Sequence, residues 1–199
     1  MKLSDFKKNS KSRVYHPKKS FEFIYSDGEE TEQGILETLR SCEDVSSFSS
    51  ELSEKIKDWP TEYHFSPTRH NLLRHLTFRR EMMILEIGCG CGAITRQLGE
   101  SGAQVHSIEG SYLRASCAAE RCRDLDNVKV FCSNFNDISL DQDYDVVLLI
   151  GVLEYANLYF GSIMNCLDST RRVLKKSGVL IIAIENQLGL KYFAGFAED

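Results

Sequence analysis

The sequence predicts an α/β fold: a doubly wound, mainly parallel sheet with helices on both faces, preceded by a small and mostly helical N-terminal layer. Two observations predict it. From residue 82 onward, short apolar runs alternate with segments of helical periodicity, which is typical of parallel strands covered on both faces. Before residue 77, apolar residues recur mainly at helical spacing. We therefore divide the 199 residues into a flexible basic leader (1–19), a cap (20–76) and a sheet domain (77–199).

The leader and the cap are predicted from local patterns. Seven of the first twenty residues are lysine or arginine and one is an acid, which predicts a solvated, flexible leader. Residues 21–25 are a strand candidate. Two amphipathic helices follow, and the second is expected to end at Pro60 with Trp59 on its apolar face. Ser66-Pro67 predicts the start of a third helix. The cap is too small for a core of its own, so we expect it to pack over the C-terminal edge of the sheet.

The sheet domain follows a strand–helix alternation. The first apolar run ends in glycines, and the last predicted helix is followed by Gly178, a common helix stop. The pattern predicts five parallel strands. The expected elements are a strand over 82–87, a helix over 93–100, a strand over 104–108, a helix over 112–122, strands over 127–132 and 144–150, a helix over 163–174 and a strand over 179–184.

Composition excludes several classes of protein. Hydrophobic residues make up 42% and charged residues 27% of the chain, and no apolar run approaches the roughly 20 residues of a membrane span. The leader carries +6 of a net charge of −5, so the remainder carries −11, which disfavours a nucleic-acid partner. Without a secretion signal, the seven cysteines are expected to be reduced in the cytoplasm. Cys89 and Cys91 are spaced too closely for a usual metal site, so we expect no metal.

The glycine loop after the first strand is the strongest functional signal. Gly88, Gly90 and Gly92 stand between a strand and a helix, where glycines permit a tight turn and close approach of a ligand to the backbone. Glu109 closes the next predicted strand, 21 residues after Gly88, and an acid there can accept both hydroxyls of a ribose. Strand, loop, helix, strand and acid in this order predict nucleoside binding.

The same loop also satisfies the dinucleotide fingerprint, so a nicotinamide-dependent dehydrogenase is the alternative. Glu86 opposes that alternative because a carboxylate at the mouth of the loop would repel a pyrophosphate. The same carboxylate suits the cationic amino group of a methionine. A dehydrogenase also usually needs a second substrate domain, for which the chain leaves no room.

These motifs together resemble those of class I S-adenosylmethionine-dependent methyltransferases, which have a Rossmann-like fold. Residues 85–92 are similar to the first signature of that family, and Glu109-Gly110 to its ribose-binding signature. Asn134-Phe135 falls at the adenine-binding position, 144–155 resembles the fourth-strand signature, and 174–180 the turn into the fifth strand. The resemblance implies S-adenosylmethionine as the cofactor. The cofactor-binding residues that we expect are Arg69, Glu86, Gly88, Cys89, Gly90, Gly92, Glu109, Gly110, Asn134, Phe135 and Gly151.

Motifs outside this core look like those of bacterial methyltransferases associated with surface-polysaccharide (O-antigen type) biosynthesis. They lie at 25–28, 58–67 and 185–195. Such methyltransferases are longer, and the sixth and seventh strands of the class I family are not evident after residue 184. We therefore expect a truncated chain whose open sheet edge could support a homodimer.

The function that we predict is methyl transfer to a small-molecule acceptor, with a sugar or polysaccharide precursor as a candidate. The third alternative is a cofactor-binding module without turnover. His64, Glu154 and Tyr155 are the candidate catalytic residues: His64 as a general base, and the other two because they follow the fourth strand of the domain at the ligand-binding edge. Arg69 is expected to pair with the methionine carboxylate. The acceptor and the methylated atom stay open.

Overall fold

The computed structural model describes residues 2–17, 28–140, 143–184 and 188–195. The strand expected over 21–25 and motif residues 185–187 lie outside these ranges. No helix in the described ranges is both long and apolar enough to cross a membrane. The helices are α1 (Glu29–Ser41), α2 (Ser50–Ser53), α3 (Trp59–Phe65), α4 (Ala93–Glu100), α5 (Tyr112–Arg121), α6 (Ala156–Phe160), α7 (Ile163–Val173) and α8 (Leu190–Phe193), and the 3-10 turns are η1 (Leu3–Asp5), η2 (Pro67–Leu72), η3 (Phe135–Asp137) and η4 (Leu153–Tyr155).

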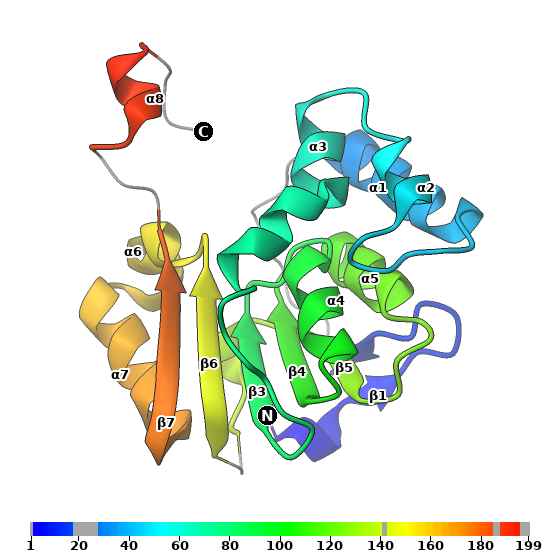
Figure 1. Cartoon of the computed structure of the whole chain (residues 1–199). Helices are drawn as coiled ribbons and strands as arrows, with labels where there is room; N and C mark the ends of the chain where they lie inside the picture. The colour runs from blue at the N-terminus through cyan, green and yellow to red at the C-terminus, as the bar shows by residue number, and fades with distance from the viewer. Residues whose placement is uncertain (1, 18–27, 141–142, 185–187, 196–199) are drawn as a thin grey trace.

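A seven-stranded sheet occupies the centre of the molecule (Figure 1). Its order is β1-β2-β5-β4-β3-β6-β7, and every neighbouring pair is parallel except β1 with β2. The five strands from β3 onward start at the centre and wind outward first to one side and then to the other, which confirms the predicted doubly wound fold. The strands are β1 (Lys7–Lys8), β2 (Tyr15–His16), β3 (Met83–Ile87), β4 (Gln104–Glu109), β5 (Val128–Cys132), β6 (Tyr144–Ile150) and β7 (Leu174–Ala183).

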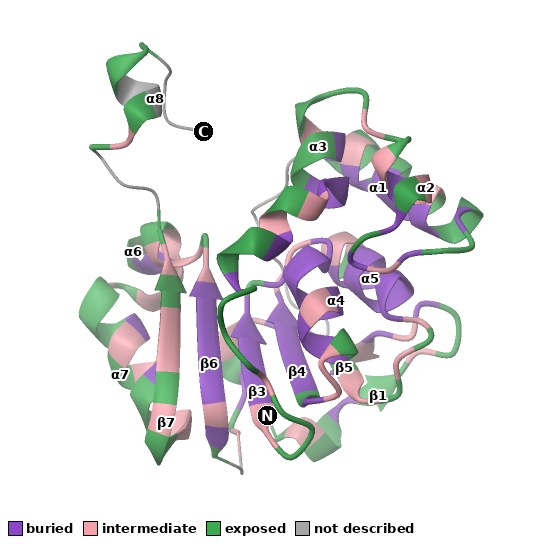
Figure 2. Ribbon diagram, viewed as in Figure 1, coloured by how far each residue is buried: buried purple, intermediate pink, exposed green. Residues whose placement is uncertain are grey.

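Both faces of the central strands are covered by helices. On one face, Leu98 of α4 packs in a buried cluster with Ile84 of β3. On the other face, Cys166 of α7 packs in a second cluster with Leu85 of β3. Successive residues of a strand point to opposite faces, so Ile84 and Leu85 anchor the two layers. Figure 2 shows β3, β4 and β6 as the most completely buried strands, as their apolar sequences predict.

The N-terminal segment is part of the sheet, which corrects the prediction of a flexible leader for residues 2–17. In the described part of the connection from β5 to β6, η3 is the only helical element. This part of the connection therefore provides no α-helix to cover the face of β5 on which Phe131 lies. The N-terminal segment covers it: the rings of Phe6 and Tyr15 lie 5.5 and 5.1 Å from the ring of Phe131. Phe6 and Val14 are buried, while the lysines of β1 are exposed. The many charged residues of this segment predicted a flexible leader, because its few apolar residues contribute little to the overall composition.

The cap packs against α5 through a shared apolar cluster. Leu39 of α1, Leu52 of α2 and Phe65 of α3 are buried together with Cys91 and Cys117 of the sheet domain. Figure 1 shows α3 and the turn that follows it above the C-terminal ends of β3 and β4. This part of the cap therefore lies over the edge where the sequence predicts a ligand.

One helix of the cap begins where the sequence predicted that another would end. Trp59 and Pro60 form the first turn of α3, and Asp58 caps it by accepting a hydrogen bond of 3.0 Å from the backbone of Thr61. Proline is tolerated in a first turn because its missing N–H has no partner there. Trp59 is consequently 59% exposed and does not lie on a buried apolar face, so this prediction was wrong.

The far edge of the sheet is formed by β7. Among the described residues, no strand pairs with its outer edge. Val179, Ile182 and Ile184 are exposed there, unlike the apolar residues of β6 (Figure 2). The sheet therefore ends at the fifth strand of the domain, as the sequence predicted.

Candidate cofactor and acceptor site

The glycine loop joins β3 to α4, and its three glycines have different surroundings. All three have positive φ, a conformation that favours glycine. A Cβ on Gly88 would lie 2.5 Å from Cγ2 of Val152, and a Cβ on Gly92 would lie 2.6 Å from Cα of Ala118. A Cβ on Gly90 would meet no atom within 4 Å. Gly88 and Gly92 therefore permit close packing, whereas Gly90 faces the open space in which a ligand can approach the backbone.

Glu109 is held beside this loop at the end of β4. Its Oε2 accepts a hydrogen bond of 2.8 Å from the backbone N–H of Gly90, and its Oε1 accepts one of 2.9 Å from that of Ser111. Burial raises the pKa of Glu109, although these hydrogen bonds and the charge of Arg114 oppose the shift. A carboxylate has about four lone-pair positions, so these backbone donors leave capacity to accept from a ligand hydroxyl. The orientation of Glu109 suits the ribose role predicted for it.

Glu86 lies on the neighbouring strand and is even more enclosed, at 2% exposed. Its Oε2 accepts hydrogen bonds of 2.6 Å from the hydroxyl of Thr95 and 2.9 Å from that of Ser107. Burial raises the pKa of Glu86 to about 7, and the hydrogen bonds and the charge of Arg69 only partly oppose this. A nearby cation would return Glu86 to its ionised form, as the amino group of a methionine would do.

Sequence reasoning missed the two hydroxyls that fix Glu86. Thr95 lies in the first turn of α4, and Ser107 pairs with Glu86 across β3 and β4. Both are fully buried. Ser107 was detectable as a small polar residue two positions before Glu109 in the predicted strand, but its partner is fixed only by the strand register.

Arg69 comes from the cap and reaches toward the same place. Its guanidinium lies over the ring of Tyr63, with Cζ 3.8 Å from the ring centroid. Its charge lowers the pKa of Glu86, which places the cation within electrostatic range of the loop. This position is compatible with the predicted contact to a methionine carboxylate.

His64 does not lie where a general base for an acceptor would. The residue is 4% exposed, and its ring contacts the ring of Tyr63 edge-on at 5.0 Å. A hydrogen bond to Cys91 is among the contacts of the imidazole, and the backbone oxygen of His64 accepts from Arg121. The imidazole therefore faces the buried side of the glycine loop, and the structure does not support the predicted base.

Two other residues predicted to contact the cofactor, Cys89 and Phe135, have side chains that pack against the protein. Cys89 is buried in an apolar cluster with Ala115 and Ala118 of α5, so only its backbone is available to a ligand. Phe135 packs against the main core and contacts the ring of Phe160 at 6.0 Å. Cys89 can therefore contribute through its backbone, and Phe135 is half-buried, so part of its ring stays accessible for the predicted contact with an adenine.

The remaining predicted residues surround the site more loosely. Asn134 is half-buried just before η3, and the backbone of Gly110 contributes to the hydrogen bonding of Glu109. Gly151 is exposed at the end of β6, with φ of +65° and no atom within 4 Å of an added Cβ. Glu154 is exposed and Tyr155 half-buried in η4. In the described part of the chain, no three His, Cys, Asp or Glu side chains are grouped to hold a metal ion.

Comparison with known proteins identifies the central segment. Residues 85–180 match the family model described as "Methyltransferase domain". Over 146 residues the chain is 27% identical to the ubiquinone biosynthesis O-methyltransferase of Rickettsia akari (strain Hartford), covering 72% of this chain and 55% of that one. It is 29% identical over 99 residues to the demethylmenaquinone methyltransferase of Tropheryma whipplei (strain Twist), covering 50% and 40%. The chain thus spans about half the length, or less, of the curated relatives it matches.

Solved structures share the fold. The CcbJ methyltransferase from Streptomyces caelestis superposes with a TM-score of 0.53 at 22% identity, covering 70% of this chain and 57% of that one. The PH0226 protein from Pyrococcus horikoshii OT3 gives 0.52 at 21% identity, covering 79% and 66%. At these identities the likeness establishes the fold alone.

Proposed function

Because residues 85–180 form an S-adenosylmethionine-dependent methyltransferase domain of the class I fold, we propose that the protein methylates a small-molecule acceptor at the C-terminal edge of its sheet. The observation that carries the proposal is the pair of buried carboxylates at the ends of β3 and β4. Glu109 accepts a hydrogen bond from the backbone N–H of Gly90, and Glu86 is held by the hydroxyls of Thr95 and Ser107. Each is oriented by two hydrogen bonds, so the site is formed before a ligand arrives.

The polar side chains at this edge of the sheet match the charged and hydrogen-bonding groups along the length of S-adenosylmethionine. Glu109 would accept the ribose hydroxyls, Glu86 would stabilise the amino group, and Arg69 would bind the carboxylate. Asn134 would contact the adenine. A dehydrogenase fits less well, since the enclosed carboxylate of Glu86 would oppose a pyrophosphate.

The cofactor supplies an activated methyl group, which passes by direct displacement from sulfur to a nucleophilic atom of the acceptor. The protein contributes orientation and exclusion of water. We place the acceptor between Tyr63 on the cap and η4 after β6, where Glu154 and Tyr155 line the more open side. Glu154 is the group best exposed to take up the acceptor's proton.

The acceptor class rests on two kinds of support. The relatives include methyltransferases of ubiquinone biosynthesis, of demethylmenaquinone and of malonyl-[acyl-carrier protein], which supports a quinone-type or acyl acceptor as one candidate. The motif resemblance to surface-polysaccharide enzymes supports a sugar or polysaccharide precursor. We propose the sugar-type acceptor as the finer hypothesis, with a quinol precursor as its direct competitor in an assay.

We also propose that the protein works in a reducing compartment, such as the cytoplasm. All seven cysteines are unpaired and buried. A homodimer through the free edge of β7 remains a proposal for the same chain.

Calorimetric titration with S-adenosylhomocysteine and, separately, with NAD tests the cofactor. Binding of S-adenosylhomocysteine alone supports the proposal, and binding of NAD alone contradicts it. Transfer of a labelled methyl group to nucleotide sugars or to quinol precursors tests turnover. Binding without transfer to any acceptor would favour a cofactor-binding module.

Hydrogen exchange tests whether the cap takes part. If α3 and η2 cover the cofactor, S-adenosylhomocysteine should slow exchange in residues 60–70 as well as in the glycine loop. Protection confined to the loop would exclude Arg69 from the site.

A further inference from the structure

Arg121, the last residue of α5, carries a guanidinium that is buried at the junction between the cap and the sheet domain. The residue is 1% exposed. Its Nη1 donates a hydrogen bond to the backbone oxygen of His64 in the cap. Its Nε and Nη2 have no hydrogen-bond partner among the described residues. Burial lowers the pKa of Arg121 to about 10, which still leaves it charged at neutral pH. A buried cation with so few partners needs an explanation.

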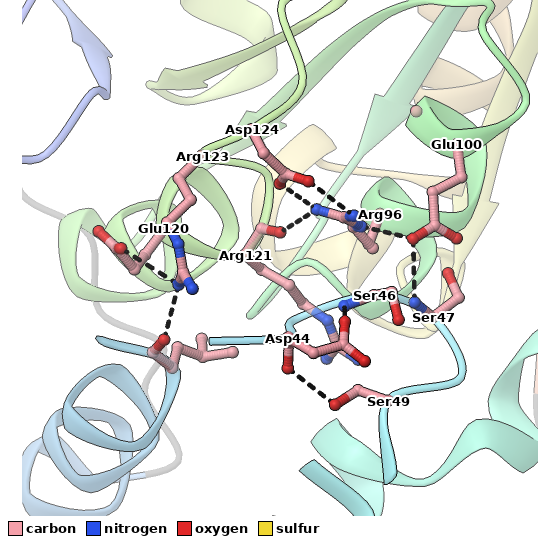
Figure 3. Close-up of polar contacts among 12 residues, drawn as sticks. Asp44, Ser46, Ser47, Ser49, Arg96, Glu100, Glu120, Arg121, Arg123 and Asp124 are labelled. Carbon is pink, nitrogen blue, oxygen red and sulfur yellow. Dashed lines mark hydrogen bonds and ion pairs between the residues drawn. The ribbon is translucent and has the colours of Figure 1, made fainter. Parts of the chain in front are cut away.

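A neighbouring arginine shows what full pairing looks like (Figure 3). Arg96 donates from Nε to Glu100 at 2.6 Å, from Nη1 to the backbone oxygen of Arg121 at 3.0 Å, and from both Nη atoms to Asp124. Arg96 ties α4 to the end of α5 within the sheet domain. Among the residues that the structure describes, the Arg121 guanidinium forms no ion pair with a carboxylate, and it donates a hydrogen bond only to the cap.

That hydrogen bond reaches the C-terminal end of α3. The last carbonyl groups of a helix have no partner within the helix and carry partial negative charge, so a cation there is stabilising. His64 is the penultimate residue of α3, which ends at Phe65. Arg121 therefore fixes the point at which α3 turns into η2.

The same turn carries Tyr63 and Arg69, the two cap residues that we assign to the cofactor side of the site. Tyr63 lies immediately before His64, and Arg69 lies in η2, five residues after it. The two side chains stack at 3.8 Å, and Arg69 is within electrostatic range of Glu86. Movement of the end of α3 would move both of them.

We propose that Arg121 is a positioning residue that holds the end of α3, and through it Arg69 and Tyr63, over the cofactor loop. The proposal rests on the proposed function, since it assigns Arg69 to the cofactor. Arg121 touches neither cofactor nor acceptor, and acts only through the cap.

Other atoms at the junction make the role separable from folding. Oγ of Ser47 and Nε2 of His70 are also buried without a hydrogen-bond partner among the described residues. Arg121→Met keeps an apolar stem of similar length and removes a buried charge whose desolvation is costly, which offsets part of the stability lost with the hydrogen bond to the His64 oxygen. Arg121→Met should therefore weaken cofactor binding while the protein still folds, with a cooperative thermal transition.

The test is a double-mutant cycle read by calorimetric titration with S-adenosylhomocysteine. Arg121→Met and Arg69→Met should each weaken binding about tenfold, and the double variant should be no weaker than the weaker single variant, because both remove one interaction. Arg121→Lys, which still offers a donor to the His64 oxygen, should recover part of the affinity.

Arg123→Met is the matched control. Arg123 also crosses to the cap, but donates to the backbone oxygens of Leu39, Cys42 and Glu43 at 2.8, 2.6 and 3.0 Å, away from α3. Its replacement should leave the affinity of the folded protein within about twofold of the starting protein.

Additive losses, unchanged affinity of Arg121→Met, or an equal loss with Arg123→Met would each overturn the proposal. If Arg121→Met does not fold, the same cycle is run with Arg121→Lys, and additivity with Arg69→Met has the same meaning. Absence of binding by the unmodified protein would instead overturn the proposed function, and the positioning role with it.

Discussion

The two halves of the ligand-binding edge of the sheet differ in how firmly they are built. At the ends of β3 and β4, Glu86 and Glu109 are buried and each accepts two hydrogen bonds. At the end of β6, Gly151 and Glu154 are exposed. Preformed polar groups bind a fixed ligand well because little reorganisation is needed. The difference indicates that the half proposed to bind the cofactor is organised before a ligand binds, whereas the half proposed to bind the acceptor is exposed.

The largest effect is expected from a side chain at Gly90. Gly90→Val should lower the affinity for S-adenosylhomocysteine by more than about a hundredfold, because the new methyl groups fill the space that the backbone offers to the ligand. Far-UV circular dichroism should still show the same fold, since a Cβ at this position meets no protein atom within 4 Å and the strain of valine at a φ of +53° is confined to the loop.

Gly88→Ala provides the contrast within the same loop. Its Cβ would lie 2.5 Å from Val152, so this variant should lose stability as well as affinity. Normal binding by Gly90→Val would show that the ligand lies elsewhere.

Removal of the ribose acid should have the next largest effect. Glu109→Ala should weaken S-adenosylhomocysteine binding by about 1.5–3 kcal/mol, the usual range for hydrogen bonds to a charged group. Titration measures this directly. Glu109→Gln is a demanding control, because both oxygens already accept from backbone N–H groups and an amide can satisfy only one of them. An affinity equal to that of the unmodified protein in both variants would exclude Glu109 from the site.

The pH dependence distinguishes Glu86 from an ordinary surface acid. If Glu86 must be ionised to receive a cationic amino group, affinity should fall by up to about tenfold per pH unit below its pKa of about 7. Titrations from pH 5.5 to 8.5 measure the slope. Glu86→Gln should bind more weakly at pH 8 and lose most of this slope. The pH dependence that remains in this variant is expected from Glu109, because burial also raises the pKa of Glu109.

The stability of the free protein should change with pH in the opposite direction. Burial raises the pKa of Glu86 from 4.5 to about 7, so the folded state holds its proton more tightly than the unfolded state. The resulting stabilisation, roughly 3 kcal/mol, is fully present below pH 4.5 and is lost as the pH rises through 7. In thermal melts, Glu86→Gln should therefore lose less stability than the unmodified protein between pH 5 and 8. An identical loss in both would contradict the raised pKa.

The smallest effect on cofactor binding is expected at the open half of the edge. Glu154→Gln should leave the affinity for S-adenosylhomocysteine within about twofold, as for most exposed substitutions. Methyl transfer to an acceptor should nevertheless slow if Glu154 takes up the acceptor's proton. A large loss of cofactor affinity would mean that the two halves are not separate.

Features encoded by adjacent residues were predictable from the sequence. The four strands β3 to β6 follow from local apolar runs, because a strand buried on both faces needs such a run. The run over 179–184 also predicted β7, but this edge strand begins at Leu174, and Gly178, predicted to follow a helix, lies within it. The glycine loop, Glu86 and Glu109 follow for the same reason: each lies at a strand end that its own neighbours define. The residue types and their order were sufficient to predict nucleoside binding.

Other features depend on surfaces far apart in the sequence, and only the tertiary structure decided them. The pairing of Tyr15 with Phe131 places the N-terminal segment in the sheet, although the charge of that segment predicts a flexible leader. Similarly, His64 has a side chain suited to the predicted role of a base, but it is buried against Tyr63 and faces away from solvent, and the side chain of Cys89 packs against α5. The direction of a side chain is set by what it packs against, so the sequence predicted the elements, whereas tertiary contacts determined which of their side chains face the ligand.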